Sequence, residues 1–377
     1  MELKKYRLGE ILELQRGYDL PSSQQKAGNV LVAGSNGIIG YHNEIRSNHP
    51  CITVGRSGNV GKVHYYEQPT WAHNTALFVK DFKGNNPQYL YYFLKNLHLD
   101  EMFVKGSSVV PSLDRKVVHS LVVPFHKEVV CQKRIALVLS NIDRKIELNR
   151  AINQNLEAMA KQLYDYWFVQ FDFPNEEGKP YKSSGGEMVW NEKLKRKIPK
   201  GWDNCTLEYF LTIKNGRDHK HLAEGVYPVY GSGGEMRRVN ENLYRGESVL
   251  MPRKGTLNNI MYVDEAFWTV DTMFYSEMKV LYCAKYIFFA IKDIDFTRWD
   301  SGTGVPSMTA STLYNLPMIK PHKDLLKRFD KTITPIFYKM KQIRVECEEL
   351  TKQRDELLPL LMNGQVSVNS DLAASYI

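Results

Sequence analysis

The chain has 377 residues, a net charge of +8 and a pI near 9.0, which leaves room for two or three domains and favours a polyanionic partner. No apolar run reaches the ~20 residues that a membrane helix needs, and the first residues lack the apolar core of a signal peptide. The five cysteines are scattered singly without a CxxC pair. We therefore expect a cytoplasmic protein with reduced thiols and no membrane association.

Residues 1–125 predict a mixed α/β module. Glycine, asparagine and proline turns separate short β-branched or aromatic runs, which predict strands at Val30–Ala33, Cys51–Val54, Val63–Tyr66, Ala76–Lys80 and Leu121–Val123. A helix is expected over Pro87–Leu97, because proline is tolerated at the first helical position.

The stretch from His126 to Gln170 contains no proline or glycine, and its apolar residues recur at seven-residue steps. This period predicts one long amphipathic helix over 126–171 that lays its apolar stripe against an equally long partner. Asn149 and Asn153 fall within the stripe, so we expect buried amides that fix the register of the pair.

Residues 172–321 predict a linker followed by a second module, because the segment begins with a proline-, glycine- and serine-rich boundary. A second heptad pattern over 322–364 predicts the partner helix, with Pro335 indicating a kink or a broken start. The remaining residues, 365–377, form a tail without a periodic pattern.

The two modules are related by an internal repeat. Leu8 and Gly17 recur 199 residues later, and GSNG at residues 34–37 recurs as GSGG 197 residues later. Arg56 meets Arg253 at the same offset of 197. The sequence therefore predicts an α+β protein built as a tandem duplication, in which each mixed module is followed by a long helix and the two helices pair as an antiparallel coiled coil.

The glycine-rich turns do not predict catalysis. GRSGNVGK at residues 55–62 lacks the spacing of a phosphate-binding loop, and no GxGxxG opens a helix. His219 and His221 have no third ligand at a sensible spacing, so solvated loop residues are the favoured interpretation and no metal site is expected. We find no catalytic constellation, and the chain is expected to bind.

Polar loops of both modules suit contacts with DNA, because Arg and Lys can bind guanine or phosphate and Asn can bind adenine through two hydrogen bonds. A single such loop is more often only a turn, but both copies keep an arginine after the same strand and change its neighbours. The candidate DNA-binding residues are Ser35, Asn36, Arg56, Ser57, Asn59, Lys62, Lys105, Ser107, Ser108, Ser232, Arg253, Lys254, Thr256, Asn258, Asn259 and Thr303.

Several short motifs resemble those of the specificity subunits of type I restriction–modification enzymes over nearly the full chain. They are DFP at 172–174, GKPYKSSGG at 178–186, IPKGW at 198–202, RKGT at 253–256, the VPS of both modules and LLPLLMNGQV at 357–366. The resemblance implies two target-recognition domains, each binding half of a split DNA site, and a helical spacer.

The same resemblance implies partners: two modification (methyltransferase) subunits, joined by restriction subunits. S-adenosylmethionine is then expected on the methyltransferase partner, with no cofactor in this chain. Two alternatives stay open. A coiled-coil scaffold that binds proteins would lack salt-dependent DNA binding. A stand-alone DNA-modifying enzyme would act on DNA without a partner.

Overall fold

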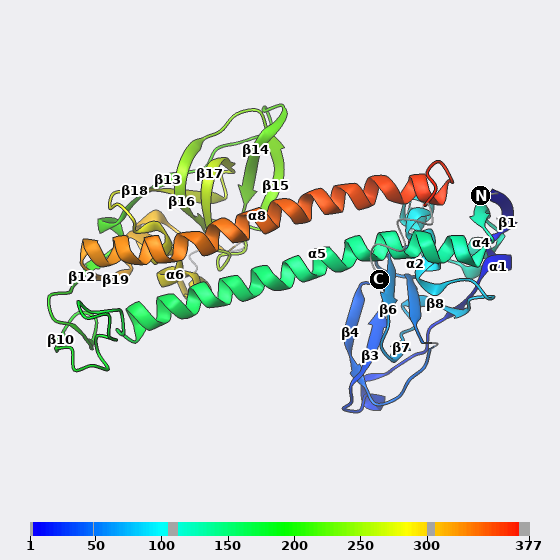
Figure 1. The fold of residues 1–377 in the computed structure, drawn as a ribbon, viewed down its shortest axis with the longest axis horizontal. Coiled ribbons are helices and arrows are strands. Elements are labelled where there is room, and N and C mark those ends of the chain that lie inside the picture. Colours follow the sequence, from blue (N-terminus) through cyan, green and yellow to red (C-terminus); the bar gives the residue numbers. More distant parts are fainter. Residues whose placement is uncertain (1–2, 48, 105–111, 300–305, 369–377) are drawn as a thin grey trace. The chain divides into compact units, whose positions relative to one another are not determined.

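The computed structural model describes residues 3–47, 49–104, 112–299 and 306–368, and the chain divides into two compact units. The first unit comprises residues 1–151 and 343–377, and the second comprises residues 152–342. Each unit has its own apolar core, and each contains a segment of both long helices, drawn as unbroken ribbons in Figure 1.

The described residues of the first unit form three small sheets and four short α-helices. Its strands are ordered β2-β8-β5-β6, β4-β3-β7 and β1-β9. The strands are β1 (Leu3–Arg7), β2 (Glu13–Arg16), β3 (Val30–Gly34), β4 (Gly37–His42), β5 (Cys51–Gly55), β6 (Val63–Tyr66), β7 (Thr70–Ala72), β8 (Ala76–Asp81) and β9 (Val122–His126). The helices are α1 (Leu8–Ile11), α2 (Pro87–Asn96), α3 (Leu99–Val104) and α4 (Arg115–Ser120).

The second unit repeats this plan around a six-stranded sheet of order β13-β18-β16-β17-β14-β15, with the pairs β12-β19 and β10-β11. The strands are β10 (Met188–Asn191), β11 (Arg196–Pro199), β12 (Asp203–Thr206), β13 (Leu211–Asn215), β14 (Glu224–Gly231), β15 (Gly234–Val239), β16 (Tyr244–Pro252), β17 (Met261–Thr269), β18 (Met273–Met278) and β19 (Pro317–Lys320). The helices are α6 (Ala284–Lys292) and α7 (Ala310–Tyr314), with 3-10 turns η3 (Leu207–Tyr209) and η4 (Phe296–Trp299).

Strand register confirms the predicted duplication. Val32 pairs with Trp71 in the parallel β3–β7 ladder, and Val229 pairs with Trp268 in the parallel β14–β17 ladder, which are equivalent positions. A continuous β17 stands where the first unit has two strands, β6 and β7. Pro69 lies in the gap between them and has no backbone N–H, whereas its equivalent Ala266 pairs with Arg245 within the ladder. The sheet of the first unit is therefore split in two.

Both long helices are confirmed, with shifted ends. Helix α5 spans Val129–Tyr164 and continues as a π-helical turn, η2 (Asp165–Val169), while α8 spans Lys323–Met362. The first helix begins later than predicted because His126 belongs to β9, where it pairs with Leu3. Pro335 was expected to mark a kink or a broken start. The broken start is wrong, because α8 runs through this residue without interruption, and the kink stays a prediction.

In each unit the two helices run antiparallel. In the first unit, Asn149 is buried and its amide donates to Glu346 at 2.9 Å, and Arg354 pairs with Asp143 at 2.7 Å. In the second unit the amide of Asn153 donates to the carbonyl of Met340 at 3.3 Å. The predicted asparagine contacts across the helix pair are confirmed, with Asn149 as the fully buried member.

Residues of the predicted linker are ordered within the second unit. The Asp172 carboxylate accepts hydrogen bonds from the backbone N–H and the hydroxyl of Ser183, both at 2.7 Å. The ring of Phe173 stacks between Tyr181 and Trp202, with centroid distances of 4.7 and 5.2 Å. Among the helices formed by the described residues, none combines the length and the apolar character needed to cross a bilayer.

Candidate nucleic-acid interface

The arginine loop of the first unit is held by its backbone at the end of β5. The N–H groups of Arg56 and Ser57 both donate to the carbonyl of Thr75, at 2.8 and 3.1 Å. The N–H of Leu113 donates to the carbonyl of Arg56 at 2.9 Å. Three segments distant in sequence therefore fix the position from which the Arg56 side chain projects.

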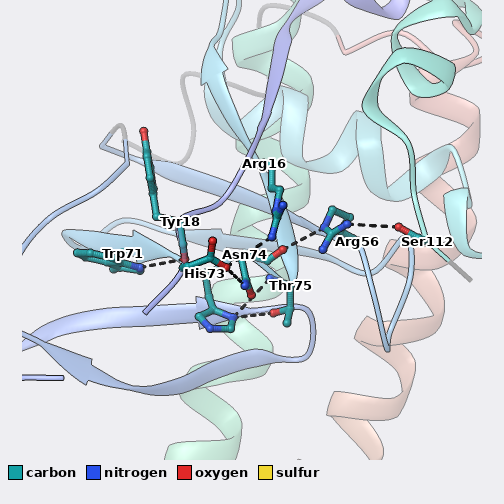
Figure 2. A network of polar contacts seen from close by, with 9 residues as sticks. Arg16, Tyr18, Arg56, Trp71, His73, Asn74, Thr75 and Ser112 are labelled. Atoms are coloured by element: carbon teal, nitrogen blue, oxygen red, sulfur yellow. Dashed lines mark hydrogen bonds and ion pairs between the residues drawn. The ribbon is translucent and has the colours of Figure 1, made fainter. Parts of the chain in front are cut away.

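The guanidinium of Arg56 is itself anchored (Figure 2). Its Nε donates to the carbonyl of Asn74 at 3.0 Å, and one terminal nitrogen donates to the Ser112 hydroxyl at 3.4 Å. The Asn74 amide donates to the Asp19 carboxylate, which also accepts from Arg16 at 3.5 Å. Two of the five N–H donors of the guanidinium are used in this way, so its other donors remain for a bound ligand.

The structure brings the other described candidates of the first unit next to this loop. The Lys62 ammonium donates to the Asn36 amide oxygen at 3.1 Å, which joins the turn 55–62 to the turn 34–37. The N–H of Ser35 donates to the Thr75 hydroxyl at 3.2 Å. Ser57 and Asn59 lie in the same turn as Lys62, with Asn59 exposed. These residues form one polar patch.

The repeated glycines Gly17 and Gly216 make the frame possible. A Cβ atom on Gly17 would lie 2.1 Å from the carbonyl oxygen of His73, and one on Gly216 would lie 2.0 Å from that of Val270. Neither position can accept a side chain without moving the backbone. The glycines follow strands β2 and β13, and they allow the ends of these strands to approach the turns that hold the arginine loops.

The second unit builds the same backbone frame. The N–H groups of Arg253 and Lys254 donate to the carbonyl of Thr272, at 2.8 and 3.2 Å, and the N–H of Met308 donates to the carbonyl of Arg253 at 2.8 Å. These bonds match those of Arg56, Ser57 and Leu113 in the first unit. The equivalence predicted for the two arginines is confirmed for their backbone positions.

The side chain of Arg253 differs from that of Arg56. It is exposed and, among the described residues, its guanidinium has no hydrogen bond or ion pair; it lies 6.0 Å from the centre of the Phe274 ring. It lines a shallow pocket together with Asn215, Lys254 and Ser307. This arginine has all five donors available to a ligand.

Of the other candidates in the second unit, two asparagines form hydrogen bonds within the chain and Thr256 is exposed. The Asn259 amide donates to the carbonyl of Ser232 at 2.8 Å and joins the two turns, as Lys62 does in the first unit. Both polar atoms of the Asn258 amide already have partners. Its nitrogen donates to the Asp295 carboxylate at 3.1 Å, and its oxygen accepts from the N–H of Phe296 at 2.8 Å. The Thr297 hydroxyl and the Asn258 amide hold the pKa of Asp295 at about 2. Thr256 is exposed beside Arg253 and Lys254.

Two residues at this surface were not among the candidates. Asn215 precedes the repeated Gly216 and lines the pocket with Arg253, and Arg16 precedes the repeated Gly17 and bonds to Asp19, so the repeat itself could have indicated both. The predicted residues Lys105, Ser107, Ser108 and Thr303 lie outside the described residues. Within the described ranges, no three His, Cys, Asp or Glu side chains group in a way that could hold a metal ion.

Comparisons with known proteins agree with this arrangement. Residues 1–158 match the family described as type I restriction modification DNA specificity domain. The chain is 25% identical over 319 residues to the type I restriction enzyme MjaIX specificity subunit of Methanocaldococcus jannaschii, covering 74% of this chain and 69% of that protein. It is 21% identical to the type I restriction enzyme HindI specificity subunit of Haemophilus influenzae, covering 62% and 67%. The crystal structure of a type I restriction–modification S subunit from M. genitalium has the same fold, with a TM-score of 0.64, 18% identity and 96% of each chain covered.

Proposed function

We propose that the chain is a specificity subunit of a type I restriction–modification enzyme, a non-catalytic subunit that confers DNA sequence specificity, and that it recognises a bipartite DNA site. One unit contacts each half-site. The single observation that supports this division is the pair of equivalent loops around Arg56 and Arg253, which share a backbone frame and differ in side chains. Two frames with different side chains suit two different half-site sequences.

The proposed assembly contains two methyltransferase subunits, which this chain recruits, and restriction subunits that join them. S-adenosylmethionine is bound by the methyltransferase subunits in this proposal, and this chain needs no cofactor. The purified chain alone is expected to show neither methyl transfer nor cleavage with DNA, Mg²⁺ and methyl donor. Activity of the rigorously purified chain would contradict the proposal and favour a stand-alone enzyme.

The half-site assignment is tested by mapping the methylated motif of complexes that contain Arg56→Ala or Arg253→Ala. Each variant should relax the base preference of one half-site and leave the other unchanged. If both variants alter the same half-site, the assignment is wrong. If affinity falls without any change in preference, the arginine contacts phosphate and not a base.

We also propose that the helix pair sets the length of the spacer between the half-sites, with half-site centres about one helical turn of DNA apart, ~10 base pairs. Because Cys347 lies against Ile146, its thiol 3.9 Å from the carbonyl oxygen, four residues must be inserted at both positions to keep the helices paired. The insertion adds ~6 Å of helix. The preferred spacer should lengthen by about one or two base pairs, since DNA rises ~3.4 Å per pair. An unchanged spacer would show that the helices only join the units.

A further inference from the structure

A groove of the first unit lies between strands β4 and β6 and helices α2 and α5. Its walls carry the tyrosines 41, 65, 66, 91 and 92 and the carboxylates of Glu67, Asp143 and Glu147. The rings of Tyr65 and Tyr91 pack against each other at a centroid distance of 5.6 Å. The groove is separate from the polar patch around Arg56, none of whose members lines it.

The second unit fills the equivalent place with its own side chains. Its pair Tyr262 and Phe288, at 6.1 Å, corresponds to Tyr65 and Tyr91. The ring of Phe337 from α8 packs on this pair, 4.8 Å from Tyr262 and 6.3 Å from Phe288. A site that is an open groove in one copy is therefore part of the apolar core in the other.

Asp143 occupies the position of Phe337 in the first unit and does not fill the groove. Its carboxylate accepts a hydrogen bond from the Tyr92 hydroxyl at 2.6 Å and pairs with Arg354 at 2.7 Å. Its charge is thus compensated within the unit. Of the other charged groups in the lining, Glu67 and Glu147 are acidic and Arg144 is basic.

The two units also differ in charge one helical turn further along the long helices. In the second unit, the Lys341 ammonium donates to the carbonyl of Asp264 at 2.9 Å and lies 3.8 Å from Glu265, which ties α8 to β17. The equivalent of Lys341 is Glu147, and that of Asp264 is Glu67. Neither of these two glutamates has a hydrogen bond or an ion pair within the described residues. Glu147 has no N–H group to donate to the backbone carbonyl of residue 67, so it cannot form the link that Lys341 forms with the carbonyl of Asp264.

We propose that this groove binds a lysine or arginine side chain of a protein partner. The cation lies on the face of Tyr65 and pairs with Glu67 and Glu147, which replaces the contact that Lys341 makes in the second unit. The Tyr91 ring beside it already carries the Lys95 ammonium of this chain, 6.0 Å from its centre. Apolar residues beside the cation rest on the exposed side chains of Ile38 and Tyr41, which are 51% and 58% accessible. Carboxylates at this position repel the phosphates of DNA, so the occupant is a protein segment.

The choice of partner rests on the proposed function: the occupant is a basic segment of a methyltransferase subunit. The informative variant is Glu147→Lys, which installs in the first unit the lysine that ties α8 to β17 in the second. Its lysine can pair with Glu67 inside the chain, so the variant should fold with a melting temperature within about 2 °C of the parent chain. The groove would then be occupied from within.

The experiment measures binding of the full chain to the purified methyltransferase subunit by calorimetry at low and moderate salt. Glu147→Lys should weaken binding roughly tenfold or more and flatten its salt dependence. The matched control is Glu176→Lys, an exposed glutamate of the second unit with the same change in charge. It should bind as the parent chain does. A second variant, Glu67→Gln, removes the other carboxylate without adding a cation and should weaken binding in the same direction.

The outcomes separate the two proposals. If the parent chain binds the methyltransferase subunit and both groove variants bind it equally well, the groove inference is overturned and the proposed function stands. If the parent chain does not bind that subunit at all, the proposed function fails and the inference falls with it. If the groove variants weaken DNA binding and leave subunit binding intact, the groove serves DNA and the inference is wrong.

Discussion

The two units place an arginine on the same backbone frame but restrain it differently. Arg56 is fixed by the Asn74 carbonyl and the Ser112 hydroxyl, whereas Arg253 is exposed above Phe274. The first arrangement suits a preorganised contact, because little side-chain entropy is left to lose on binding. The second suits an adaptable contact. Duplication has thus preserved the backbone geometry while the side chains came to differ, and the same divergence distinguishes the open groove from the filled one.

The largest difference between the units should appear at Lys285 and its equivalent, Gln88. The Lys285 side chain is 4% exposed and donates to Glu247 at 2.5 Å and Asp330 at 2.8 Å. Burial opposes its charge, but these two hydrogen bonds outweigh burial and raise its pKa. Lys285→Ala leaves two carboxylates uncompensated and should cost about 3–5 kcal/mol of unfolding free energy. Gln88→Ala should cost less than about 1 kcal/mol. Urea denaturation of both variants measures this, and equal losses would contradict the comparison.

Arg253→Ala should change DNA binding without changing stability. An exposed side chain with no partner in the described chain contributes little to folding, while loss of a base contact costs about 1–3 kcal/mol of binding free energy. Binding titrations on DNA with either half-site altered measure the effect. Arg253→Lys is the control, because it keeps the charge but loses the two-pronged geometry. A fall in melting temperature with unchanged binding would make Arg253 a structural residue.

Ser112→Ala should loosen Arg56 and make the first unit more like the second. The variant removes one hydrogen bond from the guanidinium and should cost about 1 kcal/mol or less of stability. We expect a weaker base preference in one half-site with affinity for random DNA unchanged. The control is Ser120→Ala, whose hydroxyl donates to the carbonyl of Val117 within α4. An unaltered preference would show that the anchor does not contribute to recognition.

The smallest expected difference between the units is the effect of low pH on their stability. Burial lowers the pKa of His64, His73, His119 and His126, all in the first unit. A histidine whose pKa is lowered by folding makes its full contribution to the stability of the fold at a pH above its unfolded-state pKa of about 6.5. This contribution is lost as the pH falls below that value. Hydrogen exchange between pH 7 and pH 5 should show the first unit opening more readily than the second. Equal behaviour of both units would contradict this assignment.

The sequence determined the elements whose signal is local. Short β-branched or aromatic runs predicted β5, β6 and β8, and heptad spacing predicted α5 and α8 to within a few residues. Strand β4 was missed because GIIGYH has glycines at two positions and exposed isoleucines, so its strand character depends on pairing with β3. The repeat offsets also identified the two arginine loops, because matched turns persist in sequence.

Tertiary structure alone decided what the matched positions do. The sequence aligns Arg56 with Arg253, but whether a guanidinium is anchored depends on Ser112 and on the carbonyl of Asn74, which folding brings into contact. Glu147 and Lys341 likewise look like two solvated charges on two helices. Their different roles, lining an open groove and tying α8 to β17, arise because packing places strands β6 and β17 beside them. The sequence pattern of a segment predicts a helix or a strand, because these depend on residues close in sequence. A binding site depends on contacts between residues far apart in sequence, which the pattern of a single segment does not predict.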